Sequence, residues 1–177
     1  MGHDMQLPTR STPTEGRESP VPESFEAFFE EHSLKVFGAM CLVCGNRQEA
    51  EEITQDAFLK MWERWNRVSG LEDPVGFLFR TAMNVFRDRA RRATLAARRT
   101  LGLVDRKDDL ATVEDRSELV SAMRSLTPHQ RAAVVLTGYL GYTSEQAAGI
   151  LGVRASTVRA LATKGRATAR ATAEEWR

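Results

Sequence analysis

The sequence predicts an all-α protein, built as two small helical domains that are joined by a flexible acidic linker. Apolar residues recur at helical spacing in segments that begin at capping residues. Residues 98–116 lose this spacing and gain acids, which marks a linker between domains at 24–97 and 117–177. Residues 1–23 hold four prolines among polar residues, and we expect this N-terminal extension to be disordered.

The composition is that of a globular protein, with 42% hydrophobic and 28% charged residues among 177. No apolar run approaches the roughly 20 residues of a membrane-spanning helix. The first residues also lack the basic start, apolar run and cleavage site of a signal peptide. We therefore expect a cytoplasmic protein.

The first domain is predicted to hold three helices. Ser24 caps the first helix, which ends at Gly45. The second helix runs from about residue 47 to 65, and a loop at 66–72 leads to a third helix at 73–92, with Asp73 as its cap and Pro74 in its first turn. The second helix is expected to bury one apolar stripe, formed by Ala50, Ile53, Ala57, Phe58, Met61, Trp62 and Trp65.

The third helix has two faces of different character. Its apolar stripe is expected to be buried and consists of Phe77, Leu78, Thr81, Ala82, Val85 and Phe86. Another face carries Arg80, Asn84, Arg87, Asp88 and Arg91. Arginines contact phosphates and an asparagine reads a base edge, so this face is a candidate nucleic-acid surface. An ordinary solvated face is the alternative interpretation.

Charge is unevenly distributed, although the formal net charge is only +1. Residues 24–65 hold eight acids against four bases, whereas residues 80–99 hold seven arginines against one acid. Residues 154–170 hold five bases and no acid. Two separate basic segments suggest two nucleic-acid contacts. The near-zero total argues against tight non-specific DNA binding by the free protein, because such binding depends on how many phosphates are neutralised.

A second face of the helix at 47–65 is acidic, with one apolar residue at its centre. It is formed by Glu52, Gln55, Asp56, Leu59 and Glu63. An exposed leucine among acids is typical of a docking face for a protein partner. Singly exposed leucines are also common, so an ordinary surface remains an alternative.

The only two cysteines, Cys41 and Cys44, have the C-x-x-C spacing of a redox pair or half a zinc site. The three histidines are scattered, and no second C-x-x-C completes a set of four ligands. We therefore expect both cysteines in the core of the first helix, and neither a metal nor a cofactor.

The second domain contains a helix-turn-helix pattern. Thr127 and Pro128 begin one helix, and a capping box from Thr143 to Gln146 begins another, which ends at a tight turn over residues 152–154. Val153 and Val158 are expected to fill the angle between the two helices. The exposed side of the last helix offers hydroxyls and cations that suit a DNA major groove, namely Arg154, Ser156, Thr157, Arg159, Thr163, Lys164 and Arg166. A hairpin used only for packing is the alternative.

Residues 24–172 resemble a bacterial extracytoplasmic-function (ECF, group 4) sigma factor of the sigma-70 family. The segments EAEEITQDAFLKMWERW and PVGFLFRTAMNVFRDRARR resemble the family's region 2. The segment SLTPHQRAAVVLTGYLGYTSEQAAGILGVRASTVRALATKGR resembles its region 4. Departures include Ala147, where the family usually has isoleucine, and Lys164-Gly165-Arg166 in place of Arg-Ala-Arg.

This resemblance implies a function and partners. Core RNA polymerase would bind through its beta-prime clamp coiled-coil and its beta flap, and the acidic linker would thread the polymerase channels. The clamp would contact Glu52, Gln55, Asp56, Leu59 and Glu63. The single-stranded minus-ten element would be melted and read by Phe77 (in place of the usual tryptophan), Arg80, Asn84, Arg87 and Arg91. The minus-thirty-five element would be read by Arg154, Ser156, Thr157, Arg159, Thr163, Lys164 and Arg166. An anti-sigma factor is implied as a further partner.

The alternative function is a free-standing helix-turn-helix transcriptional regulator. It would account for the second domain but would leave the acidic face and the arginine-rich helix of the first domain without a role. An enzyme is not expected, because the sequence offers no recognisable metal set, nucleophile–base pair or phosphate-binding loop.

Overall fold

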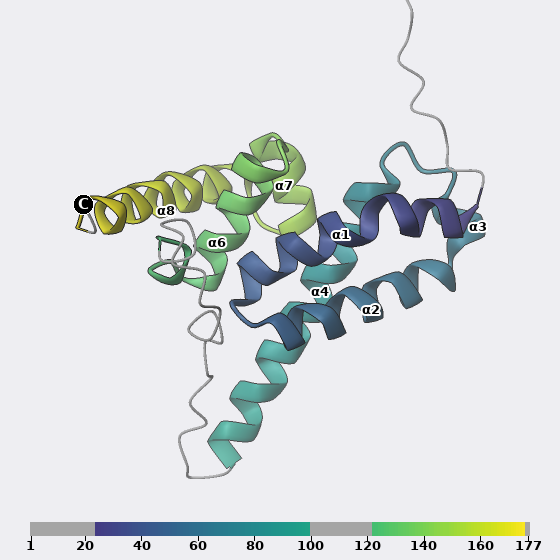
Figure 1. The fold of residues 1–177 in the computed structure, drawn as a ribbon, viewed down its shortest axis with the longest axis horizontal. Coiled ribbons are helices and arrows are strands. Elements are labelled where there is room, and N and C mark those ends of the chain that lie inside the picture. The colour runs from purple at the N-terminus through teal and green to yellow at the C-terminus, as the bar shows by residue number, and fades with distance from the viewer. Residues whose placement is uncertain (1–23, 100–121, 176–177) are drawn as a thin grey trace, which may run out of the picture.

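The computed structural model describes residues 24–99 and 122–175, and every regular element in these ranges is a helix. The first domain consists of α1 (Phe25–Cys44), α2 (Arg47–Trp62), the one-turn α3 (Trp65–Val68) and α4 (Pro74–Arg99). The second consists of α6 (Pro128–Val134), the π-helix η2 (Val135–Tyr139), α7 (Ser144–Leu151) and α8 (Ala155–Glu175), with a helical turn at 122–124 before them. The predicted all-α fold with two helical domains is confirmed (Figure 1). The predicted extension and most of the predicted linker lie outside the described residues.

The helix boundaries follow from side-chain caps. The Ser24 hydroxyl accepts a hydrogen bond from the Ala27 amide, and the Asp73 carboxylate accepts one from Gly76 at 2.7 Å. Thr127 and Thr143 form complete capping boxes with residues three positions later. These contacts satisfy amides that have no partner inside the helix, so the sequence defines each start locally.

Three predicted features of the first domain are corrected. The second helix ends at Trp62, and α3 begins at Trp65 and occupies the first part of the segment at 66–72 that was expected to be a loop. Trp62, a predicted core residue, has 59% of its surface exposed. The third helix extends to Arg99, beyond the predicted end at residue 92. A bend between α2 and α3 accounts for Trp62, because it ends the stripe at Met61 and brings Trp65 back against Phe25 and Phe28.

The two domains pack directly against each other and share one continuous hydrophobic core. α7 lies against α4, and α6 with η2 lies against α1. Figure 1 shows α1 between α2 and the group formed by α6, α7 and α8, with α4 crossing α1 and α2 and its C-terminal part projecting beyond them. The core side of α4 is therefore wider than the predicted stripe, because Phe79 and Met83 are buried as well.

The helix-turn-helix is built as predicted at most positions. Gly152 ends α7 in the left-handed conformation with φ of 67°, which favours glycine. Val158 is completely buried at the start of α8. The prediction for Val153 is corrected: it is 38% exposed and lines a groove with Met83 and Arg87 of α4, so it does not fill the angle between α7 and α8 as a buried residue.

A close approach of α8 to α6 occurs at Gly165. A Cβ atom on this buried residue would lie 2.9 Å from Cγ2 of Val134 and 3.4 Å from Cβ of Gln130. The sequence marks Gly165 as a weak point of the helix, costing about 1 kcal/mol relative to alanine. In the structure, the missing side chain lets the two helices touch.

Candidate functional site

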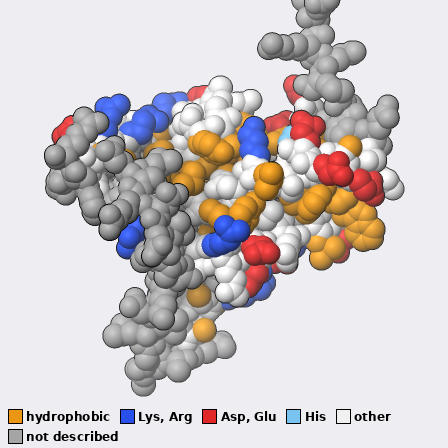
Figure 2. Space-filling model, viewed as in Figure 1, with side chains coloured by type: hydrophobic (Ala, Val, Ile, Leu, Met, Phe, Trp, Pro, Cys, Tyr) orange, Lys and Arg blue, Asp and Glu red, His pale blue; other side chains and the backbone are white. Residues whose placement is uncertain are grey.

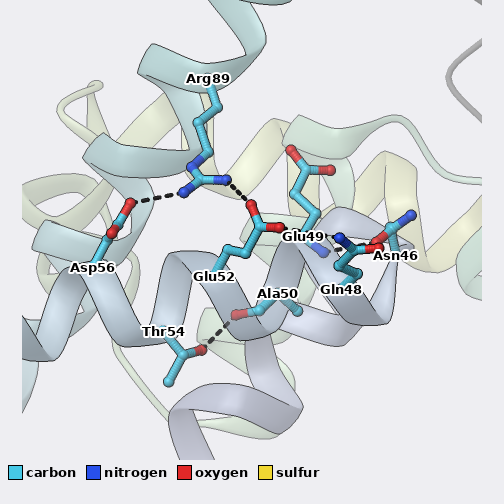
Figure 3. Close-up of polar contacts among 8 residues, drawn as sticks. All are labelled: Asn46, Gln48, Glu49, Ala50, Glu52, Thr54, Asp56 and Arg89. Atoms are coloured by element: carbon cyan, nitrogen blue, oxygen red, sulfur yellow. Dashed lines mark hydrogen bonds and ion pairs between the residues drawn. The ribbon is translucent and has the colours of Figure 1, made fainter.

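The acidic face of α2 is held by an arginine that reaches across from α4 (Figure 3). Arg89 donates hydrogen bonds to Oε2 of Glu52 and to Oδ2 of Asp56, the latter at 2.8 Å. Gln48 donates to the other oxygen of Glu52 at 3.3 Å. Hydrogen bonding from Arg89, followed by that from Gln48, lowers the pKa of Glu52. Both oxygens of Glu52 are thus engaged inside the protein, whereas Asp56 is oriented through one of its oxygens.

Beside these acids lies an exposed apolar area, which we name the α1–α2 surface and define by Phe29, Gln55, Leu59 and Trp62. Leu59 is 54% exposed and Phe29 44%. Gln55 lies between two open grooves of about 240 and 550 Å³, both of which are also lined by Phe29 and Phe58. Figure 2 shows hydrophobic and acidic side chains next to each other at this end of the molecule.

Of the predicted partner-binding residues, Gln55, Leu59 and Glu63 are exposed on this side, whereas Glu52 and Asp56 are half-buried. Sequence reasoning missed Phe29 and Trp62. Trp62 could have been found, because it follows Leu59 by three positions and such residues share a helix face. Phe29 comes from another helix and could not be placed on this surface from spacing alone.

The five residues predicted to contact the minus-ten strand all lie on α4 but differ in their surroundings. Arg80, Asn84 and Arg91 are exposed, whereas Phe77 and Arg87 are half-buried. Arg91 forms an ion pair with Asp88 at 2.6 Å, one turn earlier. The Arg87 guanidinium donates to the carbonyl oxygen of Leu151 in the second domain and to the side-chain oxygen of Asn84.

The predicted major-groove residues are all exposed at the start and along one side of α8. They are Arg154, Ser156, Thr157, Arg159, Thr163, Lys164 and Arg166. Arg159 also forms an ion pair with Glu145 of α7 at 2.9 Å, between two well-exposed side chains. Such a pair contributes little stability in water, so Arg159 remains available to a phosphate.

Cys41 and Cys44 are both partly buried and pack against the core, as predicted. Neither forms a disulfide. Burial raises the pKa of the Cys41 thiol, with the Arg47 guanidinium opposing that effect. A thiol with a raised pKa is a poor nucleophile at neutral pH, which fits a packing role.

None of the helices in the described residues has both the length and the apolar character needed to cross a membrane.

Comparisons with known proteins match both halves of the chain to one family. Residues 28–95 match the family model for Sigma-70 region 2, and residues 116–168 match the model for Sigma-70 region 4. The chain is 29% identical to the ECF RNA polymerase sigma factor SigE of Mycolicibacterium smegmatis over 85% of this chain, and it spans 62% of that protein's length. It is 25% identical to the ECF RNA polymerase sigma factor SigL of Mycobacterium tuberculosis over 75% of this chain and 79% of that protein.

Two solved structures share the fold. The sigma factor RpoE from Bartonella quintana, in complex with the anti-sigma factor NepR, superposes with a TM-score of 0.72 at 18% identity, covering 85% of this chain and 96% of that one. CnrH in complex with the cytosolic domain of CnrY gives 0.57 at 22% identity, covering 85% and 88%. With two consecutive region matches that together cover most of the chain, this chain belongs to the sigma-70 family, and the relatives named above are ECF sigma factors.

Proposed function

We propose that this protein is an alternative sigma factor, which binds core RNA polymerase and directs promoter-specific initiation of transcription. The observation that carries the proposal is the presence of three different surfaces on one chain. The α1–α2 surface is apolar and lies beside the acids of α2, whereas the exposed sides of α4 and α8 are cationic. A protein partner and two DNA segments are the ligands that suit these three chemistries.

The α1–α2 surface is the proposed contact for the clamp coiled-coil of polymerase. Leu59 and Trp62 offer the exposed apolar area of an interface centre, and Glu63 adds negative charge at its edge. Asp56 contributes from the side where Arg89 orients it. Glu52 supports this arrangement through Arg89 and Gln48, which makes it a weaker candidate for direct contact than Gln55 or Leu59.

The DNA contacts are assigned to the two cationic helices. Arg80, Asn84, Arg87 and Arg91 would bind the minus-ten strand, with Phe77 beside it as a ring on which a base stacks. The exposed residues of α8 would enter the major groove of the minus-thirty-five element, and region 4 would contact the beta flap of polymerase. Each domain binds its segment weakly, and polymerase raises the effective concentration of the second domain once the first is bound.

The remaining partner is an anti-sigma factor, which would hold the protein inactive by covering these surfaces. The proposed site of action is the cytoplasm, where core polymerase and promoter DNA are found. The role requires no catalytic residue, metal or cofactor of its own, because polymerase performs the chemistry.

Run-off transcription with purified core polymerase and a library of genomic fragments tests the proposal. The expected result is a set of discrete transcripts that require this protein and share two sequence elements upstream. The matched control is Leu59→Arg, which keeps both DNA surfaces and removes the polymerase contact. Absence of any product that depends on this protein would contradict the proposal.

A mobility-shift experiment on the resulting promoters separates the two candidate functions. A sigma factor shifts the duplex only with core polymerase present, whereas a free-standing helix-turn-helix regulator shifts it alone. The exposed cations of α8 are compatible with both functions, so this measurement is needed alongside transcription.

A further inference from the structure

We infer that Glu145 of α7 is a positioning residue, which holds Arg159 of α8 ready to read a guanine in the major groove of the upstream promoter element. This inference rests on the proposed function, because it states how one residue of the proposed minus-thirty-five contact works. Arg159 is the residue that touches DNA, and Glu145 acts through it. The structural basis is the ion pair between the two side chains.

The ion pair joins the two helices of the helix-turn-helix. Nη1 of Arg159 donates to Oε1 of Glu145 at 2.9 Å, across 14 positions of the chain. Residues 154–170 contain five bases and no acid, so this part of α8 has no carboxylate of its own. The packing of α7 against α8 brings one to Arg159. A cation of α8 thus receives a partner that helical spacing does not reveal.

Both residues of the pair are anchored on fixed backbone. Glu145 lies in the first turn of α7, where Thr143 and Gln146 form a capping box. The Thr143 amide donates to the Gln146 side chain at 2.9 Å, and the Gln146 amide donates to the Thr143 hydroxyl at 3.2 Å. Arg159 directly follows Val158, which is completely buried. The guanidinium is therefore oriented from two fixed points, although both charged side chains are well exposed.

Arg159 differs in this respect from the other exposed cations at the same surface. Within the described residues, no ion pair is found for Arg154, Lys164 or Arg166. Contacts from such cations to phosphates fix the position of a protein on DNA but carry no sequence information directly. An oriented guanidinium instead presents a planar fork of donors, which matches two acceptors on one base. The ion pair therefore marks Arg159 as the base-reading cation of this surface.

The geometry leaves the donors that a guanine requires. A guanidinium carries N–H donors on each of its nitrogens, and Glu145 engages Nη1 of Arg159. Nε and Nη2 remain for the N7 and O6 acceptors that guanine presents side by side in the major groove. Adenine has an amino group in place of O6, and this donor opposes the fork. Arg159 should therefore prefer guanine to adenine at one base pair by about tenfold or more.

The Glu145 carboxylate also makes a phosphate an unfavourable ligand for Arg159. A phosphate bound to this guanidinium would lie about 6 Å from the carboxylate, and two negative charges at that distance weaken binding about tenfold at an effective dielectric constant of about 40. The pair is weak in water, so Arg159 stays accessible to DNA. Once DNA displaces the water, the attraction within the pair strengthens. Glu145 thus favours a base edge over the phosphate backbone.

The test is the base preference of the full chain with core polymerase on promoters in which each upstream position is randomised. Arg159→Ala should lose the discrimination of about tenfold at one base pair. Glu145→Ala should lose most of it at the same base pair, and Glu145→Gln, which keeps an oxygen acceptor, should retain part of it. The matched control is Glu174→Ala, which removes the same charge from an exposed position about 22 Å farther along α8 and should leave the preference unchanged.

A double-mutant cycle separates positioning from a structural effect of Glu145. In the Arg159→Ala background, Glu145→Ala should not change the base preference further, because its effect passes through the guanidinium. An acid in the first turn of a helix also stabilises that helix, and this effect would appear equally in both backgrounds. Equal changes in both backgrounds would overturn the proposal. An unchanged preference in Glu145→Ala, with Arg159→Ala altered, would overturn it as well.

The salt dependence of binding distinguishes a base contact from a phosphate contact. If Arg159 reads a base, Arg159→Ala should leave the slope of log affinity against log salt concentration near the wild-type value. A phosphate contact would instead reduce the magnitude of that slope by about one and weaken all sequences equally, which would overturn the inference.

The same library, presented to the free chain, tells a failed inference from a failed function. If the proposed function is wrong and the protein binds DNA alone, the wild type selects sequences without polymerase, and the Glu145 and Arg159 variants are compared on those sequences. If the function is right and the inference wrong, selection requires polymerase but does not respond to Glu145→Ala. A wild type that selects no sequence under either condition would contradict both.

Discussion

Replacing Val158 with aspartate should unfold the helix-turn-helix at neutral pH. Val158 is 0% exposed at the start of α8, so a carboxylate there has no water and no placed partner. Losing the buried valine costs about 1.5 to 2 kcal/mol. The buried carboxyl avoids its charge by taking up a proton, which at pH 7 costs about 4 kcal/mol for an ordinary pKa near 3.9. The sum, about 6 kcal/mol, is comparable to the whole stability of a small domain.

The loss of stability caused by Val158→Asp should depend on pH in a defined direction. Burial raises the pKa of the new carboxyl in the folded state, so the folded variant binds the proton more tightly than the unfolded chain. The deficit relative to wild type should therefore shrink as the pH falls toward the ordinary pKa. Between pH 7 and pH 5 the variant should recover about 2.7 kcal/mol.

Urea unfolding followed by circular dichroism at both pH values is the assay. Val158→Thr is the matched control, because its hydroxyl can donate to the carbonyl of Arg154 four residues earlier. Thr54 and Thr168 already donate to backbone carbonyls in this way. The control should lose only about 1 kcal/mol. Equal unfolding midpoints for the aspartate and threonine variants would refute the burial of Val158 between α7 and α8.

Three further perturbations separate surface roles from structural ones. Leu59→Arg should weaken core polymerase binding about tenfold or more in a pull-down titration. The helical circular dichroism signal should stay unchanged, because the Leu59 side chain is mostly exposed. Loss of that signal would place Leu59 in the core. Arg89→Met should return the lowered pKa of Glu52 toward its ordinary value in a carbon-detected NMR titration. The wild type should be more stable than the variant at neutral pH, and this difference should fade as the pH falls through the lowered pKa. An unchanged pKa of Glu52 would reject the hydrogen bond between Arg89 and Glu52. Thr143→Ala should lower the free energy of unfolding by about 1 kcal/mol, because it removes the capping box of α7. The control Thr163→Ala should leave that free energy unchanged, because Thr163 is exposed inside α8 and caps no helix. Equal melting curves for the two variants would argue against the cap.

The local features of the fold could be predicted from the sequence because their causes are local. Ser24 and Thr143 mark helix starts through contacts that span three residues. Gly45 and Gly152 end their helices at positive φ, a conformation that favours glycine. The exposed cationic side of α8 follows from helical spacing once Val158 is assigned to the core. For the same reason, the predicted cationic residues lie along α4 and at the start and along one side of α8.

The arrangement of the domains could not be predicted, because its contacts join residues far apart in the chain. Arg87 and Leu151 are 64 positions apart, and Arg89 and Asp56 are 33 apart. Spacing along α4 gives only one periodic stripe, so it could not reveal that Phe79 and Met83 pack against a second domain. The predicted burial of Trp62 was wrong because its spacing fits two faces: Trp62 follows buried Phe58 by four positions and exposed Leu59 by three. The helix also ends at Trp62, and helical spacing does not show where a helix ends.

The contact at Gly165 has a consequence for engineering this protein. Tables of helix propensity recommend alanine there and promise a gain of about 1 kcal/mol. With Val134 only 2.9 Å from the added methyl group, the overpacking cost of about 1 to 3 kcal/mol cancels or exceeds that gain. The larger effect is on the orientation of α8. Thr157 lies about 12 Å along the helix axis from Gly165, so tilting α8 by about 5° at that pivot moves its hydroxyl by about 1 Å. A displacement of that size exceeds the tolerance of about 0.5 Å for a working recognition geometry. Under the proposed function, a nominally stabilised protein would therefore bind its upstream sequence less selectively.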